Sequence, residues 1–372
     1  MGVAFSTIGR LLPLHTPLPG QSVGERLESA PAPFWISLMA PRISIVMATY
    51  NGAAFLEEQL SSLERQSLPP AELVISDDDS SDGTDDIIAQ FAKRAPFPVS
   101  IGKNRPGLGF RDNFLRAAER ASGDWIAFCD QDDVWREDKL ARCADHMAQP
   151  EVTQISHQAR LIAQDGAFLG LFDQGIVTSG VRRPLFYDVW GTFWGFSLVV
   201  RRDVLGAAPI DPRFVDYVDP RFRISHDRWA FFLAQTLGRT VEIAEPLVDY
   251  RQHSANLFGA TGRPPEAAET RQSVIEKNAG YIAATRRMVE IVQGLPHSVE
   301  KDFPAFDRQQ AEAVYLHALR QLEARDRIYH GTAMTSAVLC LRTLLAGLYR
   351  NAQNDTIRWR SFAKDMAFSL KN

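Results

Sequence analysis

The chain is poor in cysteine: Cys129, Cys143 and Cys340 are the three cysteines among its 372 residues. They form no CxxC pair and no spacing typical of metal ligands. A sparse, odd number of cysteines also does not build a disulfide framework. The sequence therefore predicts a protein of a reducing, cytoplasmic compartment.

The sequence also lacks a long uncharged apolar run and an excess of positive charge. No uncharged apolar stretch reaches the length that a transmembrane helix needs. The formal net charge is -4, which excludes a global basic surface for nucleic acid. The nearest approach to a membrane span, residues 333–349, is interrupted by Arg342. We expect a core helix of a helical tail there, and a helix that lies on a membrane surface or docks a partner is the alternative.

Residues 1–40 differ from the rest of the chain. They contain five prolines and no lasting period, and they lack the cationic start and small-residue cleavage site of a secretory signal. We expect a poorly ordered extension, and Met39 is an alternative start of the natural chain.

Beyond residue 40, short apolar runs of strand length alternate with segments of helical period. The expected strands are residues 43–48, 72–76, 98–102 and 124–129. This alternation predicts a parallel α/β sheet with helices on both faces. The pattern becomes mixed after residue 150. We expect a strand over residues 153–163, a strand at the end of residues 191–202, and two short strands over residues 241–245 and 247–253. The chain is helical from about residue 266, apart from the proline-containing stretch 296–304.

Polar side chains follow three of the expected strands at the point where each strand ends. They are Thr49-Tyr50-Asn51, the run DDDSSDGT that starts at Asp77, and the run DQDD that starts at Asp130. In open α/β sheets ligands bind at the edge where the carboxyl ends of the strands meet. We therefore expect the three clusters to form one site.

The run DQDD places three carboxylates within four positions, Asp130, Asp132 and Asp133. Carboxylate oxygen ligands suit a hard cation, Mg²⁺ or Mn²⁺. The alternative is the N-cap of a helix that we expect over residues 137–147, which accounts for one carboxylate and not for three. In the run after Asp77, residues 82–86 have the features of a turn and an N-cap, which leaves Asp77 and Asp78 to bind a ligand.

Together the motifs MATYNG, VISDDDSSDGT, GDWIAFCDQDD and HDRW resemble those of family 2 glycosyltransferases of the GT-A fold. With YRQHSAN, the set most resembles bacterial rhamnosyltransferase-type members that build cell-surface polysaccharide. The resemblance covers residues 42–259 and implies a Rossmann-like sandwich with a mixed central sheet, followed by a helical C-terminal region. The chain departs from the family at Asp79, where Gly is usual, and at His226, where Glu is usual.

The resemblance also implies domains and roles. It divides the chain into the extension 1–40, a glycosyltransferase domain 41–262 with a nucleotide-binding half 41–150 and an acceptor half 151–262, and the helical region 263–372. Asp227 is the expected catalytic base, with an N-cap as its alternative role. The expected nucleotide-sugar ligands are Thr49, Tyr50, Asn51, Asp77, Asp78, Lys103, Asn104 and Asp130, of which Lys103 and Asn104 could equally form a solvated turn. The expected metal ligands are Asp130, Asp132, Asp133 and His253, and a structural role is the alternative for His253.

Three tryptophans, Trp190, Trp194 and Trp229, could form a platform for the sugar acceptor, since flat apolar rings suit sugar faces. Core packing would account for them equally well.

The sequence thus predicts an inverting, metal-dependent transfer of a sugar from dTDP-rhamnose or a UDP-hexose to a hydroxyl of a glycan or a lipid-linked glycan. The setting would be the synthesis of cell-surface polysaccharide, O-antigen or another glycan. A sugar-1-phosphate nucleotidyltransferase is the enzymatic alternative, although TYNGAAF offers no Gly-rich basic loop. The non-enzymatic alternative is a catalytically impaired nucleotide-sugar binding protein. Association with the inner face of the cytoplasmic membrane and self-association through the C-terminal helices stay open.

Overall fold

The computed structural model describes residues 41–211, 213–217, 219–254, 256, 270–351 and 356–370. The expectations for the extension 1–40 and for a domain boundary at residue 262 concern residues outside this part of the chain.

A mixed ten-stranded sheet forms the centre of the described chain, with the strand order β3-β2-β1-β4-β9-β6-β10-β5, while β7 pairs with β6 and β8 with β10. The first four strands are parallel to one another. Strand β9 runs antiparallel to both β4 and β6 and joins the two halves. The strands are β1 (Ile43–Thr49), β2 (Glu72–Asp77), β3 (Val99–Lys103), β4 (Trp125–Cys129), β5 (Val134–Trp135), β6 (Val152–Ala163), β7 (Phe168–Phe172), β8 (Gly180–Arg182), β9 (Leu198–Arg201) and β10 (Arg239–Gln252).

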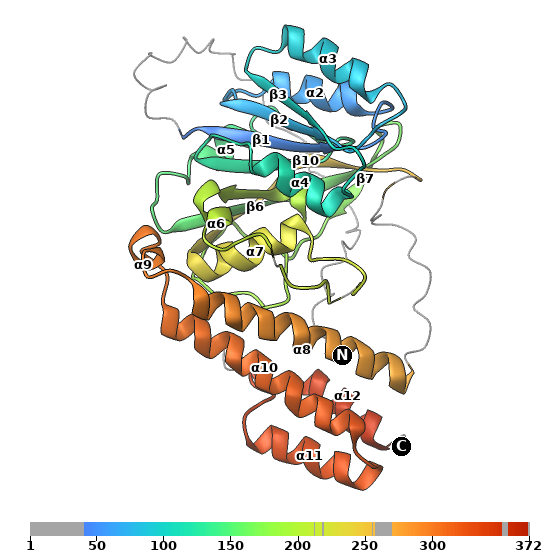
Figure 1. The fold of residues 1–372 in the computed structure, drawn as a ribbon, viewed down its shortest axis with the longest axis vertical. Helices are drawn as coiled ribbons and strands as arrows, with labels where there is room; N and C mark the ends of the chain where they lie inside the picture. Colours follow the sequence, from blue (N-terminus) through green and yellow to red (C-terminus); the bar gives the residue numbers. More distant parts are fainter. Residues whose placement is uncertain are drawn as a thin grey trace, which may run out of the picture.

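Helices cover both faces of this sheet (Figure 1). All seven residues of β1 are buried, which accounts for its continuous apolar sequence. Its side chains alternate between two cores: Ile45 and Met47 contact one helical layer, and Val46 the other. The helices are α2 (Leu56–Glu64), α3 (Thr84–Arg94), α4 (Phe110–Ala118), α5 (Lys139–Ala144), α6 (Arg202–Gly206), α7 (His226–Leu237), α8 (Arg271–Gly294), α9 (Val299–Asp302), α10 (Arg308–His330), α11 (Ala333–Leu345) and α12 (Trp359–Leu370).

The parallel α/β pattern of the first half and the helical C-terminal region are confirmed. Three details of the predicted elements were wrong. The segment expected as two short strands is the single strand β10, whose pairing with β6 shifts in register around Pro246, because a bulge lets a strand accommodate a proline. Helix α5 is also shorter than the expected residues 137–147, and α9 lies within the proline-containing stretch 296–304.

The C-terminal helices extend from the side of the sheet that α7 covers (Figure 1). Helix α8 contributes Tyr281 and Met288 to the core that contains α7. Among the described helices, none combines the length and the apolar character needed to cross a bilayer.

A buried ion pair holds α12 against α10. Arg325 donates to both oxygens of Asp365, at 2.7 and 2.8 Å. The hydroxyls of Tyr329 and Tyr349 donate to the same carboxylate, at 2.6 and 2.8 Å. Asp365 is fully buried, so removing its charge would leave the Arg325 guanidinium buried without a counter-ion.

We predict that Asp365→Asn destabilises the protein by about 3–5 kcal/mol, the usual cost of breaking a buried pair from one side. Denaturant unfolding followed by circular dichroism measures this loss. The matched control is Glu323→Gln, which removes the exposed pair between Arg286 and Glu323 and should cost less than about 1 kcal/mol. Equal losses in the two variants would show that the buried pair is not important for stability.

Candidate active site

The register of the parallel strands brings the predicted polar clusters to one edge of the sheet. Thr49 at the end of β1 lies opposite Asp77 of β2, and Asp77 lies opposite Lys103 of β3. On the other side of β1, Met47 pairs with Cys129, so Asp130 follows directly at the same edge. The clusters that the sequence separates by tens of residues are therefore neighbours.

Asp77 holds the turn after β2. Its Oδ2 accepts hydrogen bonds from the hydroxyls of Thr49 (2.7 Å) and Ser80 (2.6 Å), and its Oδ1 accepts from the backbone N–H of Ser80 (3.0 Å). Both Thr49 and Asp77 are buried. Their contacts fix the ends of two strands relative to each other.

Asp78 holds a second loop. Its Oδ1 accepts from the backbone N–H of Leu108 (2.6 Å) and from the Asn104 side chain (3.1 Å), and its Oδ2 accepts from the backbone N–H of Gly109 (2.7 Å). Gly107 passes so close that a Cβ there would lie 3.0 Å from the carbonyl oxygen of Asp78. Both acidic residues thus shape the edge of the site, and direct contact with a nucleotide stays a prediction for them.

Left-handed backbone explains why Asp79 can replace the glycine that is usual in the second motif. Asp79 has φ 68° and Asn51, across the turn, has φ 46°. Asp and Asn tolerate this region better than other residues with a side chain. Asn51 Oδ1 also accepts from the backbone N–H of Ser81 at 2.9 Å. The departure at Asp79 therefore keeps the backbone shape that the turn needs.

Gln131, between the acidic residues of the DQDD run, ties that run to the loop after β1. It accepts from the backbone N–H of Tyr50 at 2.9 Å and donates to the carbonyl of Tyr50 at 3.0 Å. Gly52 is required beside it, because a Cβ there would lie 2.3 Å from Gln131 Oε1. The side chain of Tyr50 itself is 59% exposed, which leaves its ring available to stack on a ligand.

The structure brings Asp132 and His253 together. His253 Nε2 lies 2.9 Å from Asp132 Oδ2, and the imidazole stacks on Phe55 with 4.6 Å between ring centroids. Asp133 is fully buried; its Oδ1 accepts from the backbone N–H of Arg251 at 3.1 Å, and its Oδ2 has no hydrogen-bond partner among the described residues. Burial and the charges of Asp132 and Asp130 raise the pKa of Asp133.

Two basic residues offset part of this negative charge. Arg251 donates from Nε to the carbonyl of Asp132 (2.9 Å) and forms an ion pair with Glu58 (2.5 Å). Lys139 is completely buried, donates to the carbonyl of Phe196 (2.7 Å) and lies 3.4 Å from the ring centroid of Trp135. Burial lowers the pKa of Lys139 to about 8. Sequence reasoning missed both residues, although Arg251 lies within the quoted motif YRQHSAN.

Asp227 lies in the first turn of α7, where the helix dipole favours a carboxylate. Its Oδ1 accepts from the Ser225 hydroxyl and from the backbone N–H of Arg228, while Oδ2 has no hydrogen-bond partner among the residues that the structure describes. Burial, the charge of Asp132 and the charge of Asp227 together raise the pKa of Asp130 to about 7. The electrostatic coupling indicates that Asp227 faces the same cluster.

His226 packs the core. Its ring stacks on Phe114 (3.9 Å between centroids) and meets Phe128 edge-on (4.9 Å), and burial lowers its pKa to about 4. Gly195 makes room for it, since a Cβ there would lie 2.7 Å from His226 Nε2. A neutral ring at this position fits its apolar surroundings, in place of the glutamate that is usual in the family.

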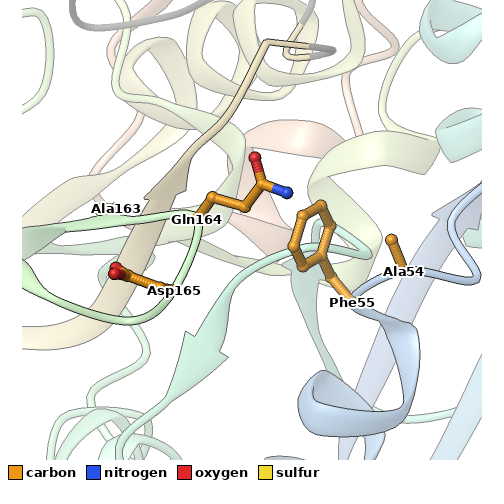
Figure 2. A pocket seen from close by; sticks show the side chains of 5 residues that line it. All are labelled: Ala54, Phe55, Ala163, Gln164 and Asp165. Carbon is orange, nitrogen blue, oxygen red and sulfur yellow. The ribbon is translucent and has the colours of Figure 1, made fainter.

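An open pocket lies beside the Phe55–His253 stack. It is lined by Ala54, Phe55, Ala163, Gln164 and Asp165. Figure 2 shows the amide of Gln164 directed toward the Phe55 ring, while Asp165 points away. The backbone carbonyl of Gln164 accepts from Arg251 Nη1 at 2.9 Å, so the pocket wall and the acidic cluster share one arginine.

The tryptophans do not form the expected platform. Trp229 is completely buried between Phe214 and Phe232, and Trp190 is buried with its indole N–H donating to Thr285 at 2.9 Å. Trp194 is partly buried against Phe172. Packing against neighbouring rings thus occupies faces that an acceptor sugar would need, and the expectation is corrected for Trp190 and Trp229.

Lys103, at the end of β3, pairs with Asp85.

The carboxylates fit a divalent cation, since they are oxygen donors that repel one another and include the orphaned, buried Asp133 Oδ2. Within the described part of the chain, no three His, Cys, Asp or Glu side chains are arranged to hold a metal by themselves. A cation of the Mg²⁺ type is commonly held by one or two carboxylates and completed by substrate phosphates.

We predict that Asp130 contributes stability to the ligand-free protein that grows as the pH is lowered from about 8 to about 5, while buried His226, whose pKa is lowered to about 4, contributes in the opposite direction. The raised pKa of Asp130, about 7 against an ordinary value of 3.8, means that the folded state holds a proton that the unfolded state has released in this range. Unfolding by denaturant at several pH values measures the slope.

Asp130→Asn should flatten this pH dependence, because the variant has no carboxyl group to titrate at that position. The control, Asp145→Asn, changes an exposed aspartate and should keep the slope of the unmodified chain. A slope that is the same in Asp130→Asn and in the unmodified chain contradicts the assignment to Asp130.

Comparison with known proteins bears on the family and the fold of the chain. The family model described as "Glycosyl transferase family 2" matches residues 44–206. An uncharacterized glycosyltransferase of Nostoc sp. is 30% identical over 249 residues, which are 65% of this chain and 74% of that protein. The dTDP-rhamnosyl transferase RfbG of Shigella flexneri is 29% identical over 58% of this chain and 74% of its own length.

The fold also resembles that of S. aureus TarS 1-349 in complex with UDP-GlcNAc. The TM-score is 0.53 at 14% identity, and the alignment covers 89% of this chain and 90% of that one. At this level of identity the likeness concerns the fold alone.

Proposed function

The chain belongs to family 2 of the glycosyl transferases, and we propose that it moves a sugar from a nucleotide-diphosphate donor to a hydroxyl acceptor in the synthesis of cell-surface polysaccharide. The fold is of the GT-A type. The observation that carries the proposal is the meeting of Asp130, Asp132 and His253 with Asp227 at the carboxyl edge of the sheet.

A dTDP-deoxyhexose such as dTDP-rhamnose is the donor that we favour, and a UDP-hexose is the alternative. The relative RfbG, a dTDP-rhamnosyl transferase, supports this choice. The exposed ring of Tyr50 offers a surface on which either pyrimidine base can stack.

We propose that Asp132 and His253, with Asp130 and Asp133 beside them, hold Mg²⁺ or Mn²⁺ together with the donor diphosphate. A bound cation would supply neutralisation of the charge on the leaving diphosphate. The chain's own contribution is to place the ligands: the Arg251 side chain donates to the backbone carbonyl of Asp132, and the Arg251 N–H donates to the carboxylate of Asp133.

Asp227 is the proposed base for the acceptor hydroxyl. Ser225 and the N–H of Arg228 hold its Oδ1, which orients Oδ2 for a proton. The acceptor oxygen would attack the anomeric carbon as its proton passes to Asp227, and the bond from that carbon to the diphosphate oxygen would break. A single displacement of this kind inverts the anomeric configuration and needs no enzyme nucleophile.

The two departures from the family motifs do not argue for an impaired enzyme. Asp79 keeps the left-handed turn, and His226 fills a buried position where its ring stacks on Phe114. Neither substitution removes a residue of the acidic cluster, so a purely sugar-nucleotide-binding role is disfavoured.

We predict that Asp227→Asn lowers the rate of sugar transfer by about 10²–10⁴-fold, the usual contribution of a general base. The affinity for the donor nucleotide should change little, since the variant keeps the shape of the side chain. Transfer is followed with radiolabelled donors from a panel of dTDP-, UDP- and GDP-sugars, and donor affinity by calorimetry.

The matched control is Asp219→Asn, which changes an aspartate paired with Arg221 on the surface and should leave transfer unchanged. A loss of donor affinity with unchanged turnover per bound donor would exclude Asp227 as the base. NMR of the first product formed should show an inverted anomeric centre, and retention would exclude the single displacement.

A further inference from the structure

Helix α11 presents its large apolar side chains outward. Met334, Val338, Leu341 and Leu345 are 78%, 46%, 50% and 87% exposed. Their spacing of four, three and four residues places them along one side of the helix. Within the described part of the chain, nothing covers this stripe to the extent expected of core side chains.

The inward side of the same helix is small and polar. Its buried residues are Ser336, Cys340 and Thr343, and Ser336 donates to the carbonyl of Ile328 in α10 at 2.6 Å. Leu339 of the same helix also packs, partly buried, against the core that contains Ile328 and Cys340. An ordinary surface helix buries its apolar stripe, whereas the four residues of this stripe are exposed. Packing within the described part of the chain therefore does not explain these four residues.

The surrounding charge is positive. Residues 331–372 contain six Lys or Arg and two Asp, within a chain whose net charge is -4. One of the two, Asp365, is buried in contact with Arg325, whereas Arg342, next to Leu341, is exposed. Figure 1 places α11 at the end of the molecule opposite the sheet, where a flat surface can approach it.

We propose that α11 docks on an anionic lipid surface, with the stripe Met334, Val338, Leu341 and Leu345 in the interface and Arg342 among the lipid headgroups. An exposed apolar helix face combined with basic residues is the pattern of helices that lie in the plane of a membrane. A second copy of the chain is the less suitable occupant, because a stable protein interface engages about 20–30 residues a side, and the stripe has four. The inference does not depend on the proposed sugar transfer.

The experiment is co-sedimentation of the full chain with vesicles of phosphatidylcholine alone and of equimolar phosphatidylcholine and phosphatidylglycerol. The chain should bind the anionic vesicles, bind the neutral ones more weakly, and dissociate as salt is raised from about 0.1 to about 0.5 M, because salt screens the attraction. Leu345→Glu should lower partitioning to the anionic vesicles by at least about tenfold, since it removes apolar burial and adds repulsion.

The matched control is Val177→Glu. Val177 is 85% exposed, nearly as much as Leu345, and lies between β7 and β8 in the sheet half, so its replacement makes the same kind of change elsewhere. It should bind vesicles as the unmodified chain does. Arg342→Gln should weaken binding to the anionic vesicles and leave binding to the neutral ones unchanged, and both α11 variants should keep the Tm of the unmodified chain.

Three results would overturn the proposal. One is the absence of binding to either vesicle, and another is equal binding by the unmodified chain and Leu345→Glu. The third, from light scattering without lipid, is a dimer that Leu345→Glu dissociates while no vesicle is bound, which would assign the stripe to contact between two copies of the chain.

Discussion

Repulsion among Asp130, Asp132 and Asp133 is the constraint on which the site depends. Parallel strands deliver these carboxylates to a partly buried edge, where burial and neighbouring charge raise the pKa values of Asp130 and Asp133. Arg251 and Lys139 offset part of the charge, yet each is already engaged with backbone carbonyls. This excess of negative charge is the basis of the proposal that the edge binds an additional cation together with a nucleotide-diphosphate sugar.

Much of this edge could be predicted from the sequence, because buried parallel strands are continuous apolar runs and their ends are followed by polar clusters. The counter-charges could not be. Arg251 lies far along the chain from the acidic run, and only the packing of β10 brings it near. Lys139 follows the run closely in the sequence, but nothing in the sequence shows that its side chain is buried and donates to the carbonyl of Phe196. Trp229 is by its sequence a candidate for an acceptor platform but is buried in the core. The sequence alone does not distinguish an aromatic residue that binds a ligand from one that packs in a core.

Departures from family motifs are explained by local geometry rather than by chemistry. Asp79 is tolerated because aspartate can adopt left-handed backbone, and His226 because its pocket is apolar and favours the neutral ring. In the C-terminal region, a buried ion pair joins α12 to α10. The apolar side of α11 is exposed. The contacts that stabilise the helical region therefore do not involve the exposed apolar side chains of α11.

The most direct test of the central claim is the Tm of the protein with dTDP and with UDP, in Mn²⁺ and in EDTA. If a cation and a diphosphate bind the carboxylate edge together, the preferred nucleotide should raise the Tm in Mn²⁺ and have little effect in EDTA, because a ligand stabilises only the state that it binds. In Asp132→Asn the shift in Mn²⁺ should be lost. An equal shift in EDTA, or an unchanged shift in Asp132→Asn, would contradict the account.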